Sequence, residues 1–358
     1  MTGRVRRVGL LTGGGDCPGL NAVIRAVTKS LIHHGGVEVL GIEDGYLGLI
    51  EGRGRPLDWR SVSGILATGG TLLGTSNRAH PFQYQGRDRS ADVLAQARAW
   101  GLDAVVAIGG DGTMAIAHQL QAIGLALVGV PKTIDNDIQG CERSFGYDTA
   151  VATATEALDR LQTTGQAHGR VMVLETMGRH AGWIALEAGI AGAADVILLP
   201  EIDYDIAAVA EVCRQREQRQ RHTLICIAEG AKARGGVQTV AGRDDSGDRF
   251  DPLRLGGVGH VLREQLQPLI ASEVRSTVLG HVQRGGSPTP FDRVLATQYG
   301  HRAAQMVLAG RFGQMVSLQQ GQLVELPLEQ VAGINRRVPL DHPLLDCARQ
   351  IGVSLGEA

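Results

Sequence analysis

Residues 129–137 read Gly129-Val130-Pro131-Lys132-Thr133-Ile134-Asp135-Asn136-Asp137 and place several polar groups directly after an apolar run. The apolar residues 126–130 predict a buried strand, and Pro131 ends it because proline has no N–H to donate to a sheet. Ligands in open α/β sheets bind at the carboxyl ends of strands. We therefore predict a ligand site here, in which Lys132 and Thr133 hold a phosphoryl group and Asp135 or Asp137 takes a proton or binds Mg²⁺. The alternative is a structural turn whose Asp and Asn side chains accept backbone N–H groups.

Composition predicts a soluble globular protein with about two to three domains, because the 358 residues are 43% hydrophobic. The net charge of −2 argues against nucleic-acid binding and against a polybasic membrane surface. No apolar run is long enough for a membrane span or a signal peptide. The five cysteines show no C-x-x-C pair and no zinc-ligand spacing. Reduced thiols and a cytoplasmic location are the resulting expectations.

Two glycine-rich turns upstream favour a phosphate ligand. A short apolar strand at residues 8–11 leads through Thr12-Gly13-Gly14-Gly15-Asp16-Cys17-Pro18-Gly19-Leu20-Asn21 into a predicted helix. Backbone N–H groups and a helix N-terminus receive phosphate in that geometry, although a tight crossover without a ligand is the alternative. A second buried strand, at 104–108, leads to Gly109-Gly110-Asp111-Gly112-Thr113, with a helix beginning near Met114. Its glycines can close around phosphates, and Asp111 can reach a bound Mg²⁺.

Further cationic side chains follow turns. The glycine- and hydroxyl-rich run 69–78 ends in Arg78, which suits a phosphate clamp but is also typical of a solvated loop charge. Arg275, His281 and Arg284 fall around a short strand and its exit loop, and Arg179 follows another strand. Such a set fits a phosphate monoester, whereas the alternative is a surface strand with solvated ends.

Strands and helices alternate along most of the chain, which predicts an α/β fold. We expect helices at residues 92–100, 150–161 and 184–191, a loop at 45–49 and a solvated, Arg- and Gln-rich helix face at 213–221. Residues 242–255 mix charges with Gly, Ser and Pro and predict an exposed loop.

These motifs together resemble the 6-phosphofructokinase family, and they occur in order across nearly the whole chain. The resemblance rests on residues 13–21, 109–113, 131–137, 177–179 and 280–288, the last reading Gly280-His281-Val282-Gln283-Arg284-Gly285-Gly286-Ser287-Pro288. It implies two Rossmann-like three-layer α/β domains with an active-site cleft between them. The phosphoryl-donor domain would be residues 1–146 plus 283–333, and the fructose 6-phosphate domain would be residues 147–282 plus 334–358.

The resemblance also implies a role for each site residue. Asp135 would be the general base that removes the proton of the sugar's C1 hydroxyl, assisted by Lys132, Arg78 and Thr133. ATP would be lined by Gly14, Arg78, Gly110, Asp111, Gly112 and Thr113, with Mg²⁺ on Asp111. Fructose 6-phosphate would be held by Thr133, Ile134, Asp135, Met177, Gly178, Arg179, Glu229, His281 and Arg284. Arg170 and Arg275 would come from a neighbouring subunit, which implies a homotetramer or a homodimer.

The donor is the open question, because two positions disagree. Members of the family that use ATP usually have glycine where this chain has Lys132, whereas those that use pyrophosphate usually pair a lysine there with an aspartate where this chain has Gly112. A carboxylate at 112 would exclude the α-phosphate of a nucleotide, and glycine leaves that space open. We therefore expect glycolytic formation of fructose 1,6-bisphosphate and ADP from ATP, with pyrophosphate as the alternative donor.

Other classes of function remain as alternatives. A lipid or NAD kinase would share the turn at 109–113 but has no need of the second polar set around Arg179 and Arg284. A non-catalytic regulatory subunit would be expected to lack Asp111 or Asp135, and both are present. Arg25, Lys29 and Asp195 fall where some bacterial relatives bind a nucleotide effector, so allosteric control is a hypothesis, with solvated helix charges as the alternative.

Overall fold

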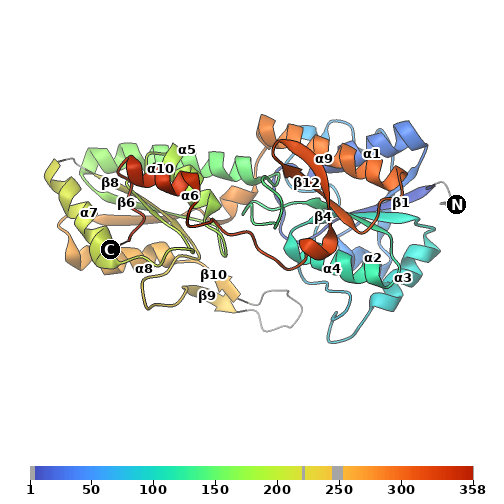
Figure 1. Ribbon diagram of the computed structural model, residues 1–358, viewed down its shortest axis with the longest axis horizontal. Helices are drawn as coiled ribbons and strands as arrows, with labels where there is room; N and C mark the ends of the chain where they lie inside the picture. Colours follow the sequence, from blue (N-terminus) through green and yellow to red (C-terminus); the bar gives the residue numbers. More distant parts are fainter. Residues whose placement is uncertain (1–4, 220–221, 244–252, 358) are drawn as a thin grey trace.

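The chain forms two sheets with helices on both faces of each (Figure 1). The structure, a computed structural model, describes residues 5–219, 222–243 and 253–357. Among these residues, no helix is both long enough and apolar enough to cross a membrane.

The first sheet has seven strands in the order β13-β12-β5-β4-β1-β2-β3. The five central strands are parallel, and β13 and β3 are antiparallel edges. The strands are β1 (Arg7–Thr12), β2 (Glu38–Ile42), β3 (Gly54–Leu57), β4 (Ala104–Gly109), β5 (Leu127–Pro131), β12 (Gln314–Gln319) and β13 (Gln322–Pro327). Their helices are α1 (Leu20–Gly35), α2 (Tyr46–Glu51), α3 (Ser90–Ala99), α4 (Asp111–Ala122) and α9 (Pro290–Leu308). In Figure 1, α1 and α9 lie on one face of this sheet and α2, α3 and α4 lie on the other.

The second sheet is wholly parallel, with four strands in the order β11-β6-β8-β7. Its strands are β6 (Val171–Thr176), β7 (Val196–Leu198), β8 (Thr223–Ala228) and β11 (Val274–Val278). Its helices are α5 (Tyr147–His168), α6 (Trp183–Ala191), α7 (Ile206–Arg219), α8 (Val258–Leu266) and α10 (Pro343–Gln350). Strand alternation divides the core: Val171 and Val173 of β6 pack in a cluster with α7 and α8, while Met172 and Leu174 belong to the larger core that includes α5 and α6.

The chain passes between the sheets three times. It leaves the first sheet after β5, returns to it after β11, and leaves it again after β13 to reach Ser354, which bridges to Val196 of β7. Buried contacts fasten the junction, because Asp292 of α9 accepts hydrogen bonds from the backbone N (2.8 Å) and the hydroxyl (2.6 Å) of Thr149 in α5. Residues from distant parts of the chain can therefore meet between the sheets.

The predicted alternation and the parallel sheets are confirmed, but several boundaries were wrong. The expected loop at 45–49 is instead the short helix α2, which begins after Gly45. The helix expected at 150–161 is α5, which is longer at both ends. The expected exposed loop at 242–255 contains parts of an antiparallel pair, β9 (Val240–Arg243) and β10 (Leu253–Leu255), and residues 244–252 lie outside the described residues. Of the helix face expected at 213–221, residues 213–219 belong to α7 and 220–221 lie outside the described residues.

Candidate active site

The two glycine turns lie side by side at the carboxyl ends of β1 and β4. The backbone N of Gly13 donates to the carbonyl of Ile108 at 2.8 Å, which joins the ends of the two strands. A Cβ atom at Gly13 would lie 2.7 Å from the hydroxyl of Thr113, so only glycine fits this close approach. Helix α4 begins at Asp111, earlier than the predicted start near Met114, because Met114 N already donates to the carbonyl of Gly110 at 3.0 Å. Gly110 to Thr113 therefore form a helix N-terminus, where the helix dipole favours an anion.

Two cationic side chains converge on the first glycine turn. Lys132, which follows β5 and is 4% exposed, donates from Nζ to the carbonyl of Gly15. Arg284 ends the 3₁₀ helix Gly280–Arg284 and donates to the carbonyl of Asp16 at 3.2 Å. Burial lowers the pKa of Lys132. The structure therefore brings together Lys132, which we assigned to phosphoryl transfer, and Arg284, which we assigned to the sugar phosphate.

Hydrogen bonds hold a loop that begins near Thr68 against the same glycine turn. Asn21, at the start of α1, donates to the carbonyls of Thr68 (3.0 Å) and Gly69 (3.2 Å) and accepts from Leu72 N at 2.7 Å. Thr75 donates its hydroxyl hydrogen to the carbonyl of Gly14 at 2.6 Å. Asn21 was not among the predicted site residues, although it ends the glycine-rich run quoted above.

Arg78 lies just past this fastened segment and is exposed. Its backbone N donates to the hydroxyl of Ser76 at 3.2 Å, and Ser76 in turn accepts from Gly14 N through its carbonyl, at 3.3 Å. The loop therefore places the backbone of Arg78 next to Ser76, which contacts the glycine turn directly.

The polar side chains of residues 135–137 differ in their hydrogen bonds. Asn136 has a left-handed backbone (φ 52°) and its side chain accepts from Ser144 N at 3.0 Å and donates to the carbonyl of Glu142 at 3.1 Å. Asp137 accepts from the Asn335 side chain at 3.0 Å. The alternative of a structural turn therefore describes Asn136, whose side chain accepts a backbone N–H, whereas the Asp137 carboxylate is held by a side chain. It does not describe Asp135, because one of its carboxylate oxygens is buried and receives no hydrogen bond from the described residues.

Three carboxyl groups at this point, those of Asp135, Asp137 and Glu229, have raised pKa values. Burial raises the pKa of Asp135, opposed by the positive charges of Arg284 and Lys132. Burial, and then the charge of Asp135, raises the pKa of Asp137 to about 7. The same two causes raise the pKa of Glu229, which follows β8, to about 8. Since Glu229 follows the second sheet and Asp135 the first, the carboxyl ends of the two sheets face a shared site.

The second sheet contributes the turn after β6 to the candidate site. Met177, Gly178 and Arg179 follow that strand directly, and Gly178 has a φ of 136° that favours glycine. The backbone N of Met177 donates to the side-chain oxygen of Gln283 at 3.2 Å, and Gln283 is fully buried. Gln283 was also not predicted as a site residue, although it lies inside the quoted motif at 280–288. His281, from the same 3₁₀ helix, is exposed at this end of β11.

Arg170 and Arg275 do not join these residues. Arg170 precedes β6, and Arg275 is paired in register with Met172 near the start of that strand. They therefore lie at the amino end of the strands, whereas Met177 lies beyond the carboxyl end, roughly 20 Å away for a six-residue strand. Glu273 holds both, accepting from Arg170 Nε at 2.6 Å and pairing with Arg275.

The three residues of the hypothetical effector site, Arg25, Lys29 and Asp195, have the following surroundings in the structure. The carboxylate of Asp195 lies 2.9 Å from Arg216 and accepts from Leu224 N at 2.8 Å, so it has a structural partner on either side. The Lys29 ammonium lies 4.2 Å from the centre of the Trp59 ring. Arg25, on the same helix, is half-buried.

The donor set suits magnesium held mainly by a ligand's phosphates. In the described part of the chain, no three His, Cys, Asp or Glu side chains are grouped so as to hold a metal ion. Magnesium usually binds one or two carboxylates together with substrate phosphates and water, rather than an all-protein cage. Asp111, half-buried at the first turn of α4 and close enough to raise the pKa of Asp137, fits that mode.

Comparison with known proteins assigns this arrangement to a class and then to a family. The structure has two α/β units, and acidic side chains, cationic side chains and glycine turns lie together at the carboxyl ends of their strands. That combination is typical of proteins that bind phosphate groups. The model of the family described as Phosphofructokinase matches residues 7–307, and the chain belongs to that family.

Its relatives include both donor types. The chain is 46% identical over 364 residues to "ATP-dependent 6-phosphofructokinase 2" of Clostridium perfringens, covering 99% of each chain. It is 47% identical over 334 residues to "Pyrophosphate--fructose 6-phosphate 1-phosphotransferase" of Amycolatopsis methanolica, covering 93% of this chain and 96% of that one. Among solved structures, it superposes on Pichia pastoris phosphofructokinase in the T-state with a TM-score of 0.79 and 32% identity. That match covers 93% of this chain and only 36% of the Pichia chain.

Proposed function

We propose that this protein transfers the terminal phosphoryl group of ATP to O1 of fructose 6-phosphate, giving fructose 1,6-bisphosphate and ADP. The observation that carries the proposal is the buried oxygen of Asp135, which receives no hydrogen bond from the described residues and lies among the charges of Lys132, Arg284 and Glu229. A carboxylate in that state is a suitable acceptor for a hydroxyl proton.

In the proposed reaction, Asp135 takes the proton of the C1 hydroxyl as the oxygen attacks the terminal phosphorus, and the bond to the leaving ADP oxygen breaks. Lys132 and Arg78 neutralise charge on the phosphoryl group as it moves, and Thr133 orients Asp135 by accepting from its backbone N at 3.1 Å. The N-terminus of α4 and the Gly14 turn hold the donor's phosphates. Met177, Gly178, Arg179, Glu229, His281 and Arg284 hold the sugar phosphate beside Ile134.

Magnesium belongs to the same proposal. Asp111 would hold the ion, which when bound neutralises the donor's phosphate charge. The residues around it act without forming a covalent intermediate, because phosphoryl transfer depends mainly on positioning and on charge stabilisation.

Pyrophosphate is the second candidate donor. Lys132 favours it, as does the similarity to the Amycolatopsis protein that is named for it. Gly112 favours ATP, because glycine there leaves room for the α-phosphate, and several relatives are named as ATP-dependent. The test is an initial-rate assay with each donor at saturating fructose 6-phosphate. We expect ATP to give the higher kcat/KM, and a preference for pyrophosphate would overturn the assignment.

We further propose that the active site is completed across subunits of a homotetramer or homodimer. The support is the position of Arg170 and Arg275 at the amino ends of β6 and β11, on the opposite edge of the sheet from Met177. Within one chain they are too distant to contact the same substrate. From a neighbouring copy they can approach it, and Glu273 keeps their guanidinium groups together at the surface.

The domain division and the location are proposed on similar grounds. Strands β1–β5, β12 and β13 lie in one sheet and β6–β8 and β11 in the other, which supports donor residues 1–146 plus 283–333 and acceptor residues 147–282 plus 334–358. All five cysteines are unpaired, as is usual in the cytoplasm, where this reaction's substrates would be met.

A further inference from the structure

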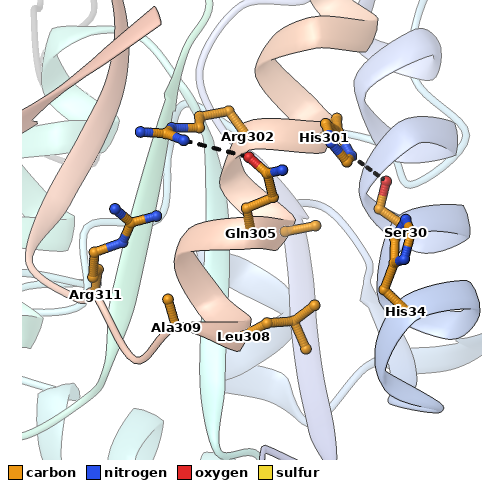
Figure 2. Close-up of a pocket in the computed structure, with 9 residues that line it drawn as sticks. Ser30, His34, His301, Arg302, Gln305, Leu308, Ala309 and Arg311 are labelled. Carbon is orange, nitrogen blue, oxygen red and sulfur yellow. Dashed lines mark hydrogen bonds between the residues drawn. The ribbon is translucent and has the colours of Figure 1, made fainter.

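A hollow lies over α9, away from the candidate active site. It has a volume of about 610 Å³ and is lined by Ser30, His34, His301, Arg302, Ala304, Gln305, Leu308, Ala309 and Arg311 (Figure 2). The glycine turn precedes the N-terminus of α1, whereas Ser30 and His34 belong to the last turns of that helix. A 16-residue helix is roughly 24 Å long, so the hollow is separate from the site around Asp135.

The lining is cationic. Of the nine lining residues in the described chain, two are arginines, two are histidines and none is acidic. Glu325 of β13 lies behind them, 2.9 Å from Arg302 and 3.1 Å from Arg311. One carboxylate thus faces two guanidinium groups, which leaves an excess positive charge. The Nε of Arg302 is buried and has no hydrogen-bond partner among the described residues.

The hollow also has an apolar part. Figure 2 shows Arg302 and Arg311 on one side of α9, His301, Ser30 and His34 on the other, and Leu308 between the two sides. Ser30 and His301 are joined by a hydrogen bond of 3.1 Å, and Arg302 donates to Gln305 at 3.4 Å. Leu308 and Ala309 are exposed although they are apolar, and the volume falls within the range of small-molecule sites, roughly 300–1,000 Å³.

We propose that this hollow binds a small organic phosphate. Arg302 and Arg311, already held side by side by Glu325, receive the phosphate group, because paired guanidinium groups match its oxygens. Leu308 contacts the organic part, and His34 and His301 offer further donors on the opposite wall. The binding requires no turnover and does not depend on the reaction proposed above.

Phenyl phosphate is a suitable probe, because it combines one phosphate group with one apolar ring. Its binding is measured by isothermal titration calorimetry on the intact protein and on the Gln305→Glu variant. Gln305 is exposed, so this change leaves the core in place, and it adds a carboxylate next to Arg302, which donates to Gln305 at 3.4 Å. The added carboxylate should weaken one phenyl phosphate site per chain by about tenfold, which is the scale expected of one charge at short range in a partly exposed site.

Two matched variants control for charge alone. Gln218→Glu makes the same change at an exposed position of α7, and Arg349→Gln removes another arginine that pairs with a glutamate, Glu357. Both should leave the isotherm unchanged, whereas Arg311→Gln should weaken the site as Gln305→Glu does.

Two results would overturn the proposal. One is that Gln305→Glu and Arg311→Gln bind phenyl phosphate as the unchanged protein does, in which case any anion binds elsewhere. The other is that the unchanged protein shows no phenyl phosphate site at all. If the Gln305→Glu variant then also has a different sedimentation coefficient from the unchanged protein, another subunit covers the hollow. Loss of phosphofructokinase activity would bear on the proposed function and not on this inference.

Discussion

Asp135 and Asp137 are two residues apart, but they differ in their hydrogen bonds. Asp137 accepts a hydrogen bond from Asn335, whereas a buried oxygen of Asp135 receives none from the described residues. Burial raises the pKa of both side chains, and the charge of Asp135 raises the pKa of Asp137 further. In the function proposed above, this difference in hydrogen bonding is what would let Asp135 accept a proton from the substrate.

Replacement of Asp135 should separate binding from turnover. We expect Asp135→Asn to bind both substrates and to lose about 10²- to 10⁴-fold in kcat, the range typical of a lost general base. Asp137→Asn is the matched control, and it should lose stability with a smaller change in kcat. Steady-state rates and equilibrium binding measure the two effects. Near-normal turnover of Asp135→Asn would remove Asp135 from the role.

Glu229 predicts a pH dependence of stability. Its pKa is raised in the folded protein from 4.5 to about 8, mainly by burial, so the folded state keeps a proton that the unfolded chain has released in that interval. Stability contributed by this group therefore falls as the pH rises from 4.5 towards 8. Glu229→Gln cannot titrate, so its free energy of unfolding should fall less over the same interval. Urea unfolding at the two ends measures the slopes, and equal slopes would contradict the assignment.

At the scale of elements, the loop from Thr68 depends on one side chain of α1. Asn21 is 3% exposed and makes three hydrogen bonds to the loop backbone, to Thr68, Gly69 and Leu72. The loop in turn contacts the Gly14 turn through Thr75 and Ser76. A helix, a loop and a glycine turn are thus fixed relative to one another at the proposed donor site.

Asn21→Ala should loosen this assembly. The variant leaves buried backbone groups unpaired, so we expect a loss of about 1–3 kcal/mol in the free energy of unfolding. Because the loop carries Arg78, KM for ATP should rise more than KM for fructose 6-phosphate. Chemical denaturation and steady-state kinetics measure both. Asn77→Ala, at an exposed position of the same loop, should change stability by less than about 0.5 kcal/mol. Equal effects on both KM values would show that the loop does not serve the donor.

At the scale of the whole molecule, the separation of Arg275 from Asp135 predicts complementation between subunits. Arg275 lies near the amino end of β11, and the site lies beyond the carboxyl ends of the strands. If the site is shared, one chain supplies Asp135 and its neighbour supplies Arg275. A mixed assembly can then contain an intact site even when every chain is defective.

Co-expression of Asp135→Asn chains with Arg275→Gln chains tests this directly. Each variant alone should be impaired, the first in kcat and the second in its affinity for fructose 6-phosphate. When the two variants mix at random in equal amounts, about half of the sites have a normal Asp135, and about half of those receive a normal Arg275 from the neighbouring chain. About a quarter of the sites should therefore contain both normal residues and regain full activity. Activity equal to the average of the two separate variants would place both residues in the same chain's site. Arg349→Gln in place of Arg275→Gln is the control for a surface charge.

Much of the fold was predictable because its signals are local. The strands ending near Gly109 and Pro131 are apolar runs followed by turn residues, and both lie where the pattern indicates. The helix α2 was missed because Gly45 and Gly48 are poor helix formers, and tertiary packing overrides that preference: Tyr46 and Leu49 are buried, and Tyr46 donates to the carbonyl of Thr113 at 3.0 Å. The pair β9–β10 was missed because its strands are only four and three residues long, and their pairing depends on a partner that lies about ten residues away along the chain.

The sequence by itself determined the glycine turns, the acids and cations beside them, and the alternation of strand and helix, because each of these depends on residues that are close along the chain. Only the tertiary structure decided that Glu229 lies near Asp135, that Lys132 and Arg284 meet at one turn, and that Arg170 and Arg275 lie at the opposite end of their strands. Those distances depend on how two sheets built from interleaved segments pack against each other. Burial and charge at the junction are properties of that packing, and no local pattern contains them.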